Sequence, residues 1–496
     1  MTTPAEPSRE RPGHAARTVT TNTLSVALAN IANRVLMFAF YVVAARHLGV
    51  SEYGVLSGGL AFVTMFSVFT DLGLGNITAR EIARDRSIGA SYVGNSLSIV
   101  GLTALCVMCL VAMLANILNY PLRSVRVIYI LCLWLVAGAL TSYCAYVFLG
   151  LERMYVTAGA QLLQTLLLVG GGFLLARGPA LAERYALLYT AAGVLVAAAV
   201  FLSAARLLGG LRFRFEFRQW WFLLKASIPV GIAAAVVSIY YWNGYTILQR
   251  IHGSAPVGIL NAAFRLVVGA CFAAMSLSAA LFPLLSRYFA ADPERLPRVF
   301  QTGSRYLTLL VLPVVILTQP LARPVVNLIY GSEYVPAAAV LRVLVWWGGV
   351  AAFSSLCSNY VLAANRGPLI MYQALVSLGV SVAGNLIMIP PLGAMGAAIA
   401  LVTAEIAGLV LLLVFLRRAR LAFDFRSQGV LMLRAALALV PALVPGIFAD
   451  RTSSVPLWIA ALLGSLGIYL LMLLVTGVIR QEDIGFIRSL LRKSDG

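Results

Sequence analysis

Two arginines, Arg34 and Arg265, each lie near the middle of a long apolar stretch of the sequence. A charged side chain at the centre of a lipid bilayer costs at least roughly 2.5–3.5 kcal/mol, so it is normally kept only where it faces a protein cavity or a partner. A guanidinium offers a planar fork of hydrogen-bond donors that matches the oxygens of a phosphate group. The two residues therefore indicate a membrane protein with an interior site for an anion, for which phosphate is the best chemical match.

The depth of these arginines follows from helix geometry. Arg34 precedes Arg46, at the outer end of its stretch, by 12 residues, or about 18 Å of helix rise. Arg265 lies about eight residues into its stretch, or about 12 Å from the same side. Both are expected near mid-depth. Arg46 and Arg250 flank the outward ends of these helices, where they either receive and release an anionic head group or extend to the interface as ordinary surface arginines.

A structural role is the alternative for Arg34 and Arg265, in which a nearby carboxylate or helix C-terminal carbonyl groups neutralise each charge. The acidic residues at membrane depth are Asp71 and Glu405. Glu405 shares its stretch with Thr403, and Asn385 lies in the preceding one. A carboxylate with neutral oxygen ligands can bind Na⁺ or carry a proton. A hydrogen-bonded contact between helices explains Glu405 equally well, so both interpretations stay open.

A polar aromatic run lies near the end of another apolar stretch and contains Tyr241, Trp242 and Asn243. These side chains could contact sugar residues by stacking and hydrogen bonding. Aromatic residues near a membrane interface more commonly form a belt at the level of the lipid head groups. The run is therefore a candidate sugar contact with an ordinary alternative.

The elements that must position these residues are membrane-spanning helices. The chain has 496 residues, of which 61% are hydrophobic and 11% charged, whereas soluble domains are about one quarter charged. Stretches of roughly 20 apolar residues can cross a bilayer, and the sequence predicts an all-α polytopic protein with about fourteen of them. The predicted spans are 20–45, 54–75, 92–116, 127–150, 157–176, 185–206, 226–249, 257–282, 305–329, 338–363, 369–390, 394–416, 430–449 and 455–478.

Basic residues between the spans predict the orientation. With the N-terminus in the cytoplasm, 26 of the 37 lysines and arginines fall in cytoplasmic segments and 9 in outward ones. This asymmetry follows the positive-inside rule and places both termini in the cytoplasm. The net charge of +19 then suits anionic membrane lipids, and nucleic acid is not an expected partner.

A weak internal repeat divides the sequence after six spans, which predicts two parallel halves. At an offset of 204 residues, Arg46, Gly49 and Gly54 match Arg250, Gly253 and Gly258. At an offset of 213 residues, Leu149 and Arg153 match Leu362 and Arg366.

Motifs for catalysis are absent from the sequence. It holds no G-x-x-x-x-G-K-[ST], H-E-x-x-H or G-x-S-x-G pattern and only three histidines. A P-loop ATPase, a zinc peptidase and a serine hydrolase are therefore disfavoured. We expect a transporter and not an enzyme, with no metal site and no cofactor.

Four segments between residues 18 and 420 together resemble the MOP exporter superfamily, and within it most closely the polysaccharide-biosynthesis flippases. They are Ala45 to Gly54, Asp71 to Ala83, Ile329 to Leu341 and Asn385 to Ala398. The resemblance implies two six-helix lobes arranged as a V. The lobes would comprise residues 18–210 and 211–420, followed by spans 13 and 14 in 421–480. Residues 1–17 and 481–496 would be cytoplasmic tails, the first of them disordered.

The resemblance also implies a function. Such a protein moves a polyprenyl-pyrophosphate-linked oligosaccharide from the cytoplasmic to the outer face of the bacterial inner membrane, in surface polysaccharide biosynthesis. In the related lipid II flippases, arginines of spans 1 and 8 line a central cationic cavity, which implies this role for Arg34 and Arg265. Those flippases can also hold Na⁺ with an acid in span 7, where this chain offers only Asn243. The implied drive is a coupling ion (Na⁺ or H⁺) or the membrane potential. The implied partners are membrane lipids, a polysaccharide polymerase and glycosyltransferases.

Three alternatives remain from the sequence. A drug or cation antiporter of the MATE type would need intramembrane acids, which are scarce. A lipid II flippase would share the cationic cavity. A membrane glycosyltransferase or ligase would need catalytic carboxylates in a large outer loop, and Glu333 lies in a short one.

Overall fold

The computed structural model describes residues 12–85, 89–175, 180–210, 217–292, 294–418, 425–443 and 455–475. Within these ranges every regular element is a helix and no strand occurs, which confirms the predicted all-α fold. Residues 1–11 and 481–496, which belong to the predicted tails, lie outside the described residues. The first helix begins at Pro12, so the described end of the N-terminal tail is helical.

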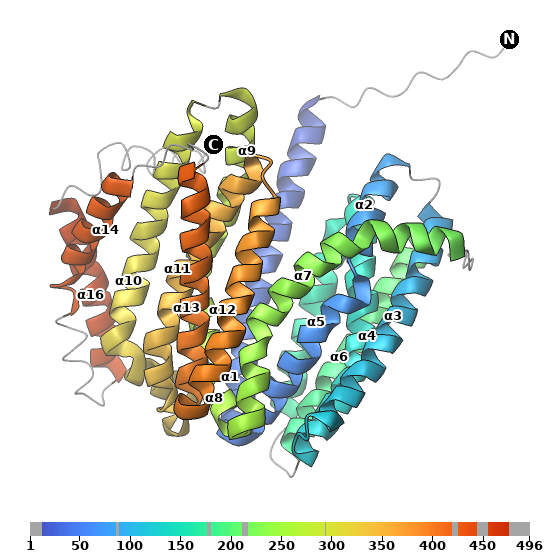
Figure 1. Cartoon of the computed structure of the whole chain (residues 1–496), viewed down its shortest axis with the longest axis horizontal. Helices are drawn as coiled ribbons and strands as arrows, with labels where there is room; N and C mark the ends of the chain where they lie inside the picture. Colours follow the sequence, from blue (N-terminus) through green and yellow to red (C-terminus); the bar gives the residue numbers. More distant parts are fainter. Residues whose placement is uncertain are drawn as a thin grey trace. The chain divides into compact units, whose positions relative to one another are not determined.

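Figure 1 labels the helices in chain order. Those of the first half are α1 (Pro12–Asp71), α2 (Leu74–Arg84), α3 (Gly89–Ile117), α4 (Leu122–Gly150), α5 (Met154–Leu174) and α6 (Leu181–Leu207). Those that follow are α7 (Phe217–His252), α8 (Ser254–Ala270), α9 (Phe272–Ala291), α10 (Leu296–Tyr330), α11 (Ala337–Ala363), α12 (Pro368–Leu392), α13 (Ala394–Arg418), α14 (Phe425–Leu439) and α16 (Val455–Val475). A short 3₁₀ helix, Ser332–Tyr334, joins α10 to α11.

Helix length and composition support a multi-pass membrane protein. In the described part of the chain, 10 helices are long and apolar enough to cross a membrane. The apolar part of α1, Ala29–Asp71, has 43 residues, which correspond to about 65 Å of helix rise. A bilayer core is only about 30 Å thick, so this segment is long enough for two passes. The helix is interrupted at Gly49 (φ 67°, ψ 174°), between the predicted spans 20–45 and 54–75.

Two of the predicted spans are broken helices. The predicted span 54–75 is interrupted at Leu72 (φ 48°) and Gly73 (φ 84°), between α1 and α2. The predicted span 257–282 is interrupted at Cys271, where α8 ends and α9 begins. Discontinuous membrane helices leave backbone groups that can serve a binding site.

The internal repeat is visible in the backbone conformation of two glycines. Gly49 has φ 67° and ψ 174°, and Gly253, at the predicted offset of 204 residues, has φ 78° and ψ −166°. Positive φ is reached without strain by glycine and rarely by other residues. The two positions therefore form the same bend, which explains why the sequence keeps glycine at both.

The ends of α4 and α11 repeat in the same way. Glu152 (φ 59°) and Asn365 (φ 55°) are left-handed and 213 residues apart. The next residues, Arg153 and Arg366, each donate the backbone amide to a carbonyl oxygen five residues earlier, at 2.8 and 3.1 Å. This is the hydrogen-bond pattern of a Schellman helix end, so the offset predicted from sequence marks matching helix termini.

The helices divide by their contacts into two compact units. Unit 1 comprises the chain up to His47 and Phe66–Ala235, and unit 2 comprises Leu48–Met65 and the chain from Val236 onward. The helices α1 and α7 therefore each contribute to both units. The lobe boundaries at residues 210 and 420 remain a prediction.

Repeat-related residues meet inside unit 2. The Ser57 hydroxyl accepts a hydrogen bond from the Asn261 amide at 2.8 Å, and these residues are 204 positions apart. One turn away, a Cβ atom added to Gly258 would lie 2.2 Å from the carbonyl oxygen of Val50. The second pass of α1 and helix α8 thus approach with almost no side chain between them, which only glycine permits.

Each unit has its own apolar core. In unit 1, Tyr143 and Phe148 of α4 are fully buried in a cluster that also takes side chains from α2, α3 and α6. In unit 2, the described parts of α14 and α16 pack on α10, where Leu317, Leu439 and Leu473 are buried.

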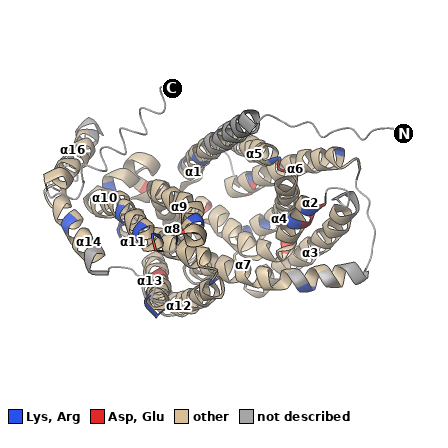
Figure 2. Ribbon diagram, turned by 90° about the horizontal axis from the view of Figure 1, so that it is seen from above, with Lys and Arg blue, Asp and Glu red and all other residues tan. Residues whose placement is uncertain are grey.

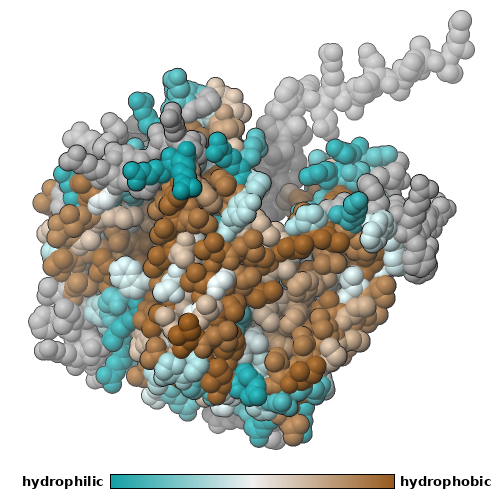
Figure 3. Space-filling view, viewed as in Figure 1, coloured by the Kyte–Doolittle hydropathy of each residue, from teal (hydrophilic) through white to brown (hydrophobic). Residues whose placement is uncertain are grey.

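Polar and apolar side chains separate along the helices. Figure 3 shows apolar side chains over the middle of the helices on the visible face and hydrophilic ones near their ends. Figure 2 marks the ribbon positions of lysine and arginine in blue and of aspartate and glutamate in red; the sequence has 37 basic and 18 acidic residues. This banding is what a bilayer requires, because charged groups stay at the level of the lipid head groups.

Candidate functional site

Arg34 lies on α1 in unit 1 and has an exposed side chain. Its neighbour Asn33 fixes this part of α1 to α5, because the Thr165 hydroxyl donates a hydrogen bond to the Asn33 side-chain oxygen at 2.5 Å. Two turns later Phe40 is fully buried. Its ring lies 5.4 Å from the ring of Tyr189 on α6. The helix that carries Arg34 is therefore held by contacts with two helices, α5 and α6, within unit 1.

Arg46 marks the far end of this part of α1 and is exposed. The adjacent His47 ring nitrogen Nδ1 lies 3.1 Å from the Tyr185 hydroxyl, which donates to the Gly172 carbonyl oxygen at 3.1 Å. These contacts anchor the helix end and leave the Arg46 guanidinium at the surface of the chain.

Arg265 lies on α8 in unit 2 and is half-buried. One turn earlier, Asn261 donates hydrogen bonds to the Tyr53 hydroxyl at 2.9 Å and to the Ser57 hydroxyl at 2.8 Å. Arg265 also interacts electrostatically with Tyr330 on α10. The Arg265 side chain therefore lies near Tyr330, within unit 2.

Arg250 lies in the last turn of α7 and is exposed. A basic residue in this position is stabilised by the negative end of the helix dipole. Two residues later, the His252 ring nitrogen Nε2 lies 2.9 Å from the Ile389 carbonyl oxygen of α12. Arg250 therefore has a structural role at the end of α7, in addition to its predicted contact with an anionic head group.

The two intramembrane carboxylates have other partners than arginine. Asp71 accepts a hydrogen bond from the backbone amide of Gly75 at 3.0 Å, at the start of α2. Glu405 is 5% exposed and accepts a hydrogen bond from the Tyr240 hydroxyl at 2.5 Å. Within the described ranges, neither carboxylate forms a salt bridge. Asp71 and Glu405 therefore do not neutralise Arg34 and Arg265 in this structure, in contrast to that part of the predicted alternative.

Asn243 and Asn385 form a buried amide pair between α7 and α12. The Asn385 amide donates to the Asn243 side-chain oxygen at 2.6 Å, and the Asn243 amide donates to the Ser381 hydroxyl at 3.1 Å. Asn243 also donates to two carbonyl oxygens of its own helix, at 2.7 and 2.9 Å. Its hydrogen-bonding groups are thus engaged within unit 2.

The predicted cation ligands are only partly brought together. Asn385 contacts Asn243, and Glu405 contacts Tyr240. Thr403 donates its hydroxyl to the Ala400 carbonyl oxygen of its own helix at 3.0 Å. Residues two apart on a helix point in nearly opposite directions, so Thr403 and Glu405 do not face one ion. In the described part of the chain, no cluster of three or more histidine, cysteine or acidic residues could hold a metal ion.

The aromatic residues of the predicted sugar contact pack against other rings. The Tyr241 ring lies 6.0 Å from the Trp347 ring, and the Trp242 ring lies 5.5 Å from the Tyr245 ring. Both Tyr241 and Trp242 remain partly exposed. A sugar contact at this place stays a prediction.

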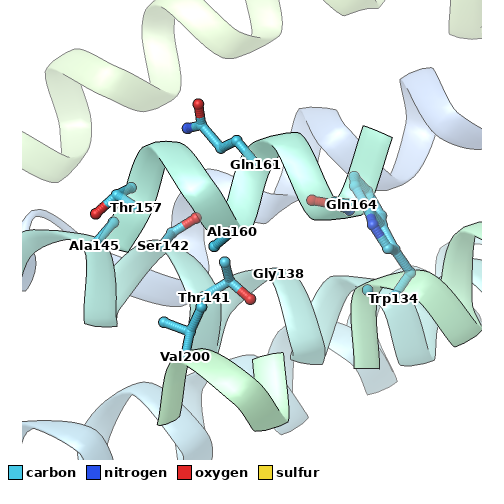
Figure 4. Close-up of a pocket in the computed structure, with 11 residues that line it drawn as sticks. Trp134, Gly138, Thr141, Ser142, Ala145, Thr157, Ala160, Gln161, Gln164 and Val200 are labelled. Carbon is cyan, nitrogen blue, oxygen red and sulfur yellow. The ribbon is translucent and has the colours of Figure 1, made fainter. Parts of the chain in front are cut away.

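Sequence reasoning missed a pocket inside unit 1 between α4, α5 and α6, with a volume of about 220 Å³. Figure 4 shows Trp134 and Gln164 at one end of it, Thr157 and Ala145 at the other. A signal was present in the sequence: Thr157, Gln161 and Gln164 have the i, i+4, i+7 spacing that places them on one face of a helix. Two glutamines on one face of a membrane span indicate a cavity or a partner on that side.

A family profile described as "Polysaccharide biosynthesis protein" matches residues 19–289, more than half of the 496-residue chain. The chain belongs to this polysaccharide biosynthesis protein family. A second profile, described as "MatE", matches residues 229–387. No curated protein matches this family member by sequence.

Solved structures show the same fold as this polysaccharide biosynthesis family member. The lipid II flippase MurJ, in an inward closed conformation, is similar with a TM-score of 0.75 and 13% identity, over 92% of this chain and 99% of that one. An inward-facing multidrug resistance MATE family transporter of the MOP superfamily is similar with a TM-score of 0.61 and 14% identity, over 79% and 98%. The MATE multidrug transporter DinF-BH gives a TM-score of 0.57 and 17% identity, over 80% and 95%.

These comparisons confirm the resemblance to the MOP exporter superfamily and the multi-pass membrane fold. The four arginines of the candidate site lie within the range matched by the polysaccharide biosynthesis profile. Thr403 and Glu405 lie beyond both matched ranges. The family assignment therefore bears on the part of the chain that carries the predicted anion site.

Proposed function

We propose that this protein moves a polyprenyl-pyrophosphate-linked oligosaccharide from the cytoplasmic to the outer face of the bacterial inner membrane. It acts by alternating access, with both termini in the cytoplasm. Its partners are membrane lipids, the glycosyltransferases that supply the lipid-linked glycan and the polymerase that consumes it.

The observation that carries the proposal is the pair of arginines in apolar helices of a polysaccharide biosynthesis family member. Arg34 and Arg265 each lie well inside a helix, and the carboxylates at membrane depth, Asp71 and Glu405, bind other groups. A cationic interior suits an anionic head group and disfavours a cationic drug. Arg46 and Arg250 would attract the same pyrophosphate at the outward helix ends.

The pyrophosphate binds first in the proposed cycle. Its oxygens pair with the two guanidinium forks in a region of low dielectric constant, where charge-assisted hydrogen bonds are strong. The sugars remain in the hydrated interior because an unsatisfied buried hydroxyl costs roughly 1–3 kcal/mol. The polyprenyl tail stays in the lipid. No ATP is consumed; the membrane potential, alone or with a coupling ion, drives the export of the anion.

Gene deletion tests the proposal. Deletion is expected to abolish surface polysaccharide and to leave lipid-linked oligosaccharide facing the cytoplasm. Plasmid-borne wild-type protein restores export, whereas Arg34→Ala and Arg265→Ala do not. Arg298→Ala, which replaces an exposed arginine in the N-terminal part of α10, serves as the matched control and restores export.

Other outcomes separate the alternatives. Normal surface polysaccharide in the deletion strain, with no redundant flippase present, contradicts the proposal. A loss of cell-wall precursor export points to lipid II as the substrate. Binding of cationic dyes that is indifferent to both arginine substitutions points to a drug antiporter.

A further inference from the structure

The pocket in unit 1 has a neutral, polar lining. It lies between α4, α5 and α6 and is lined by Trp134, Gly138, Thr141, Ser142, Ala145, Thr157, Ala160, Gln161, Gln164, Gly193 and Val200. None of these residues is charged. A phosphate group or a cation would find no counter-charge here, so the pocket suits an uncharged ligand with many hydrogen-bonding groups.

Most polar groups of the lining are available to a ligand. Within the described ranges, the hydroxyls of Ser142 and Thr157 and the amides of Gln161 and Gln164 form no hydrogen bond to the protein. Each glutamine amide offers two donors and one acceptor group, and each hydroxyl can donate and accept. Thr141 is the exception, because its hydroxyl donates to the Ala137 carbonyl oxygen at 3.0 Å.

The position of these groups within membrane helices argues for a role. Polar side chains at membrane depth are costly when they face lipid and normally face a cavity or a partner. Gln161 and Gln164 share one face of α5 with Thr157. In Figure 4, Gln164 lies beside Trp134, Ser142 and Ala160 lie in the middle of the pocket, and Gln161 extends away from Val200. Gln164, next to the Trp134 ring, is therefore the glutamine best placed to bind a ligand in the pocket.

Trp134 supplies an aromatic surface at one end of the pocket. Its ring packs at 83° to the Tyr189 ring, with 6.2 Å between the ring centroids. One turn further along α6, Gly193 lets the ring approach the helix, since an added Cβ would lie 2.7 Å from the Trp134 Cδ1 atom. An indole fixed in this way combines an apolar face with an N–H donor, which matches the alternating apolar and hydroxyl surfaces of a sugar ring.

The pocket is connected within unit 1 to the segment that carries Arg34. The Asn33 side chain binds Thr165, which follows Gln164 on α5. The Phe40 ring packs on Tyr189, which packs on Trp134. These contacts join the segment of α1 that carries Arg34 to the helices that line the pocket, so a ligand whose phosphate binds at Arg34 lies on the same unit as the pocket.

We propose that this pocket binds one neutral sugar residue of the lipid-linked glycan, the one nearest the pyrophosphate. The inference rests on the proposed function. The volume of about 220 Å³ equals that of about seven water molecules at roughly 30 Å³ each. It is smaller than the roughly 300–1,000 Å³ of ordinary small-molecule sites, so it holds a single ring and not an oligosaccharide. Gln164, Ser142 and Trp134 are the specificity-determining residues.

Binding measurements on the full-length protein in lipid nanodiscs test this. The two probes are polyprenyl pyrophosphate and the same lipid carrying one neutral hexose on the pyrophosphate. Wild-type protein is expected to bind the hexose-bearing lipid about tenfold more tightly, as one or two additional hydrogen bonds predict. Gln164→Leu and Ser142→Ala are expected to reduce this preference to about threefold or less, with unchanged affinity for the bare lipid.

Two further variants separate the sugar pocket from the anion site. Arg34→Ala is expected to lower the affinity for both probes by the same factor, because it removes a contact with the phosphate that both probes share. The preference for the hexose-bearing lipid should remain. Leu163→Ala lies on α5 outside the pocket lining and is expected to change neither affinity. The affinity for the bare lipid, together with a size-exclusion profile, verifies that each variant is folded.

The outcomes separate the two proposals. Equal binding of both probes by the wild-type protein, or a preference that survives both Gln164→Leu and Ser142→Ala, overturns the sugar pocket. In that case the proposed function stands if Arg34→Ala still weakens binding. Failure of the wild-type protein to bind either lipid, or an Arg34→Ala variant that binds like wild type, contradicts the proposed function itself.

Discussion

At the scale of single residues, the chain carries charged side chains within apolar helices, where a membrane makes them costly. Arg34 and Arg265 lie within apolar helices, while Glu405 binds a tyrosine. The proposed function requires that the arginines act on a ligand, whereas the contact of Glu405 with Tyr240 indicates that the glutamate acts within the protein. Substitution of the arginines should affect transport, whereas substitution of Glu405 should affect stability. The two roles can therefore be distinguished.

Replacing Arg34 or Arg265 tests the ligand-binding role. Alanine is expected to lower flipping of a pyrophosphate-linked lipid at least tenfold, a factor that corresponds to about 1.4 kcal/mol. Lysine should restore part of the rate, because it keeps the charge but not the bidentate fork. The rate is measured in proteoliposomes at equal protein content. Equal rates for alanine and wild type would refute the anion site.

Replacing Glu405 tests the internal role. Glu405→Leu removes the acceptor of the buried Tyr240 hydroxyl, which also accepts a hydrogen bond from the Trp347 indole at 3.3 Å. We expect a loss of roughly 1–3 kcal/mol in stability, seen as a lower Tm. Glu405→Gln keeps an oxygen acceptor and should stay close to wild type in Tm. If Glu405→Gln is stable but makes transport insensitive to a Na⁺ or proton gradient, the carboxylate carries the coupling ion.

At the scale of helices, glycines decide which elements can approach. The second pass of α1 meets α8 at Gly54 and Gly258, and Trp134 meets α6 at Gly193. At each contact the neighbour occupies the space that a Cβ would take. These helix pairs are therefore specified by the absence of a side chain.

Gly258→Ala is expected to destabilise unit 2. The added Cβ would lie 2.2 Å from the Val50 carbonyl oxygen, so the two helices must separate. Overpacking of this kind costs about 1–3 kcal/mol, and a lower Tm should report it. Gly101→Ala in α3 is the control, because its Cβ would meet nothing within 4 Å. A Tm for Gly258→Ala equal to that of the control would contradict the close approach.

Gly193→Ala is expected to displace the Trp134 ring in unit 1. The protein should still bind bare polyprenyl pyrophosphate, but its preference for the hexose-bearing lipid should fall several-fold, since a displaced ring fills the pocket. Gly170→Ala on α5 has open space around its Cβ and should behave as wild type. Nanodisc binding with the two lipid probes measures both variants.

At the scale of the whole molecule, the proposed transport moves negative charge outward across the membrane. A potential that is negative inside favours this by about 2.3 kcal/mol per charge per 100 mV. In proteoliposomes with a potassium diffusion potential, flipping is expected to accelerate when the cytoplasmic side is negative and to slow when the sign is reversed. Acceleration with the opposite sign would mean that the protein's own moving charges, or a coupled cation, outweigh the pyrophosphate.

Much of this molecule was predictable from local sequence. Apolar stretches long enough to cross a bilayer defined the helices, while the orientation that the asymmetry of basic residues predicts stays a prediction. The repeat was readable because Gly49 and Gly253 serve the same left-handed bend, a local requirement that glycine alone meets without strain. Glu152 and Asn365 show that a helix end can repeat where the residue type does not.

Contacts between distant residues were not predictable from the sequence. Nothing in the spacing of Glu405, Thr403 and Asn385 indicates that the first binds Tyr240, the second its own helix and the third Asn243. The breaks in the predicted spans at Gly73 and Cys271 were missed as well, because apolar residues continue through them.

The sequence by itself determined that this chain is a helical membrane protein with two similar halves and arginines within apolar stretches, because hydropathy and charge act on each segment locally. Only the tertiary structure decided which polar groups are already bound and which are open to a ligand. Asn243 is engaged and Gln164 is not, although each is an amide in an apolar helix. The difference lies in the neighbouring helices, since a hydrogen bond needs a partner within about 3 Å and sequence spacing does not fix that distance between helices.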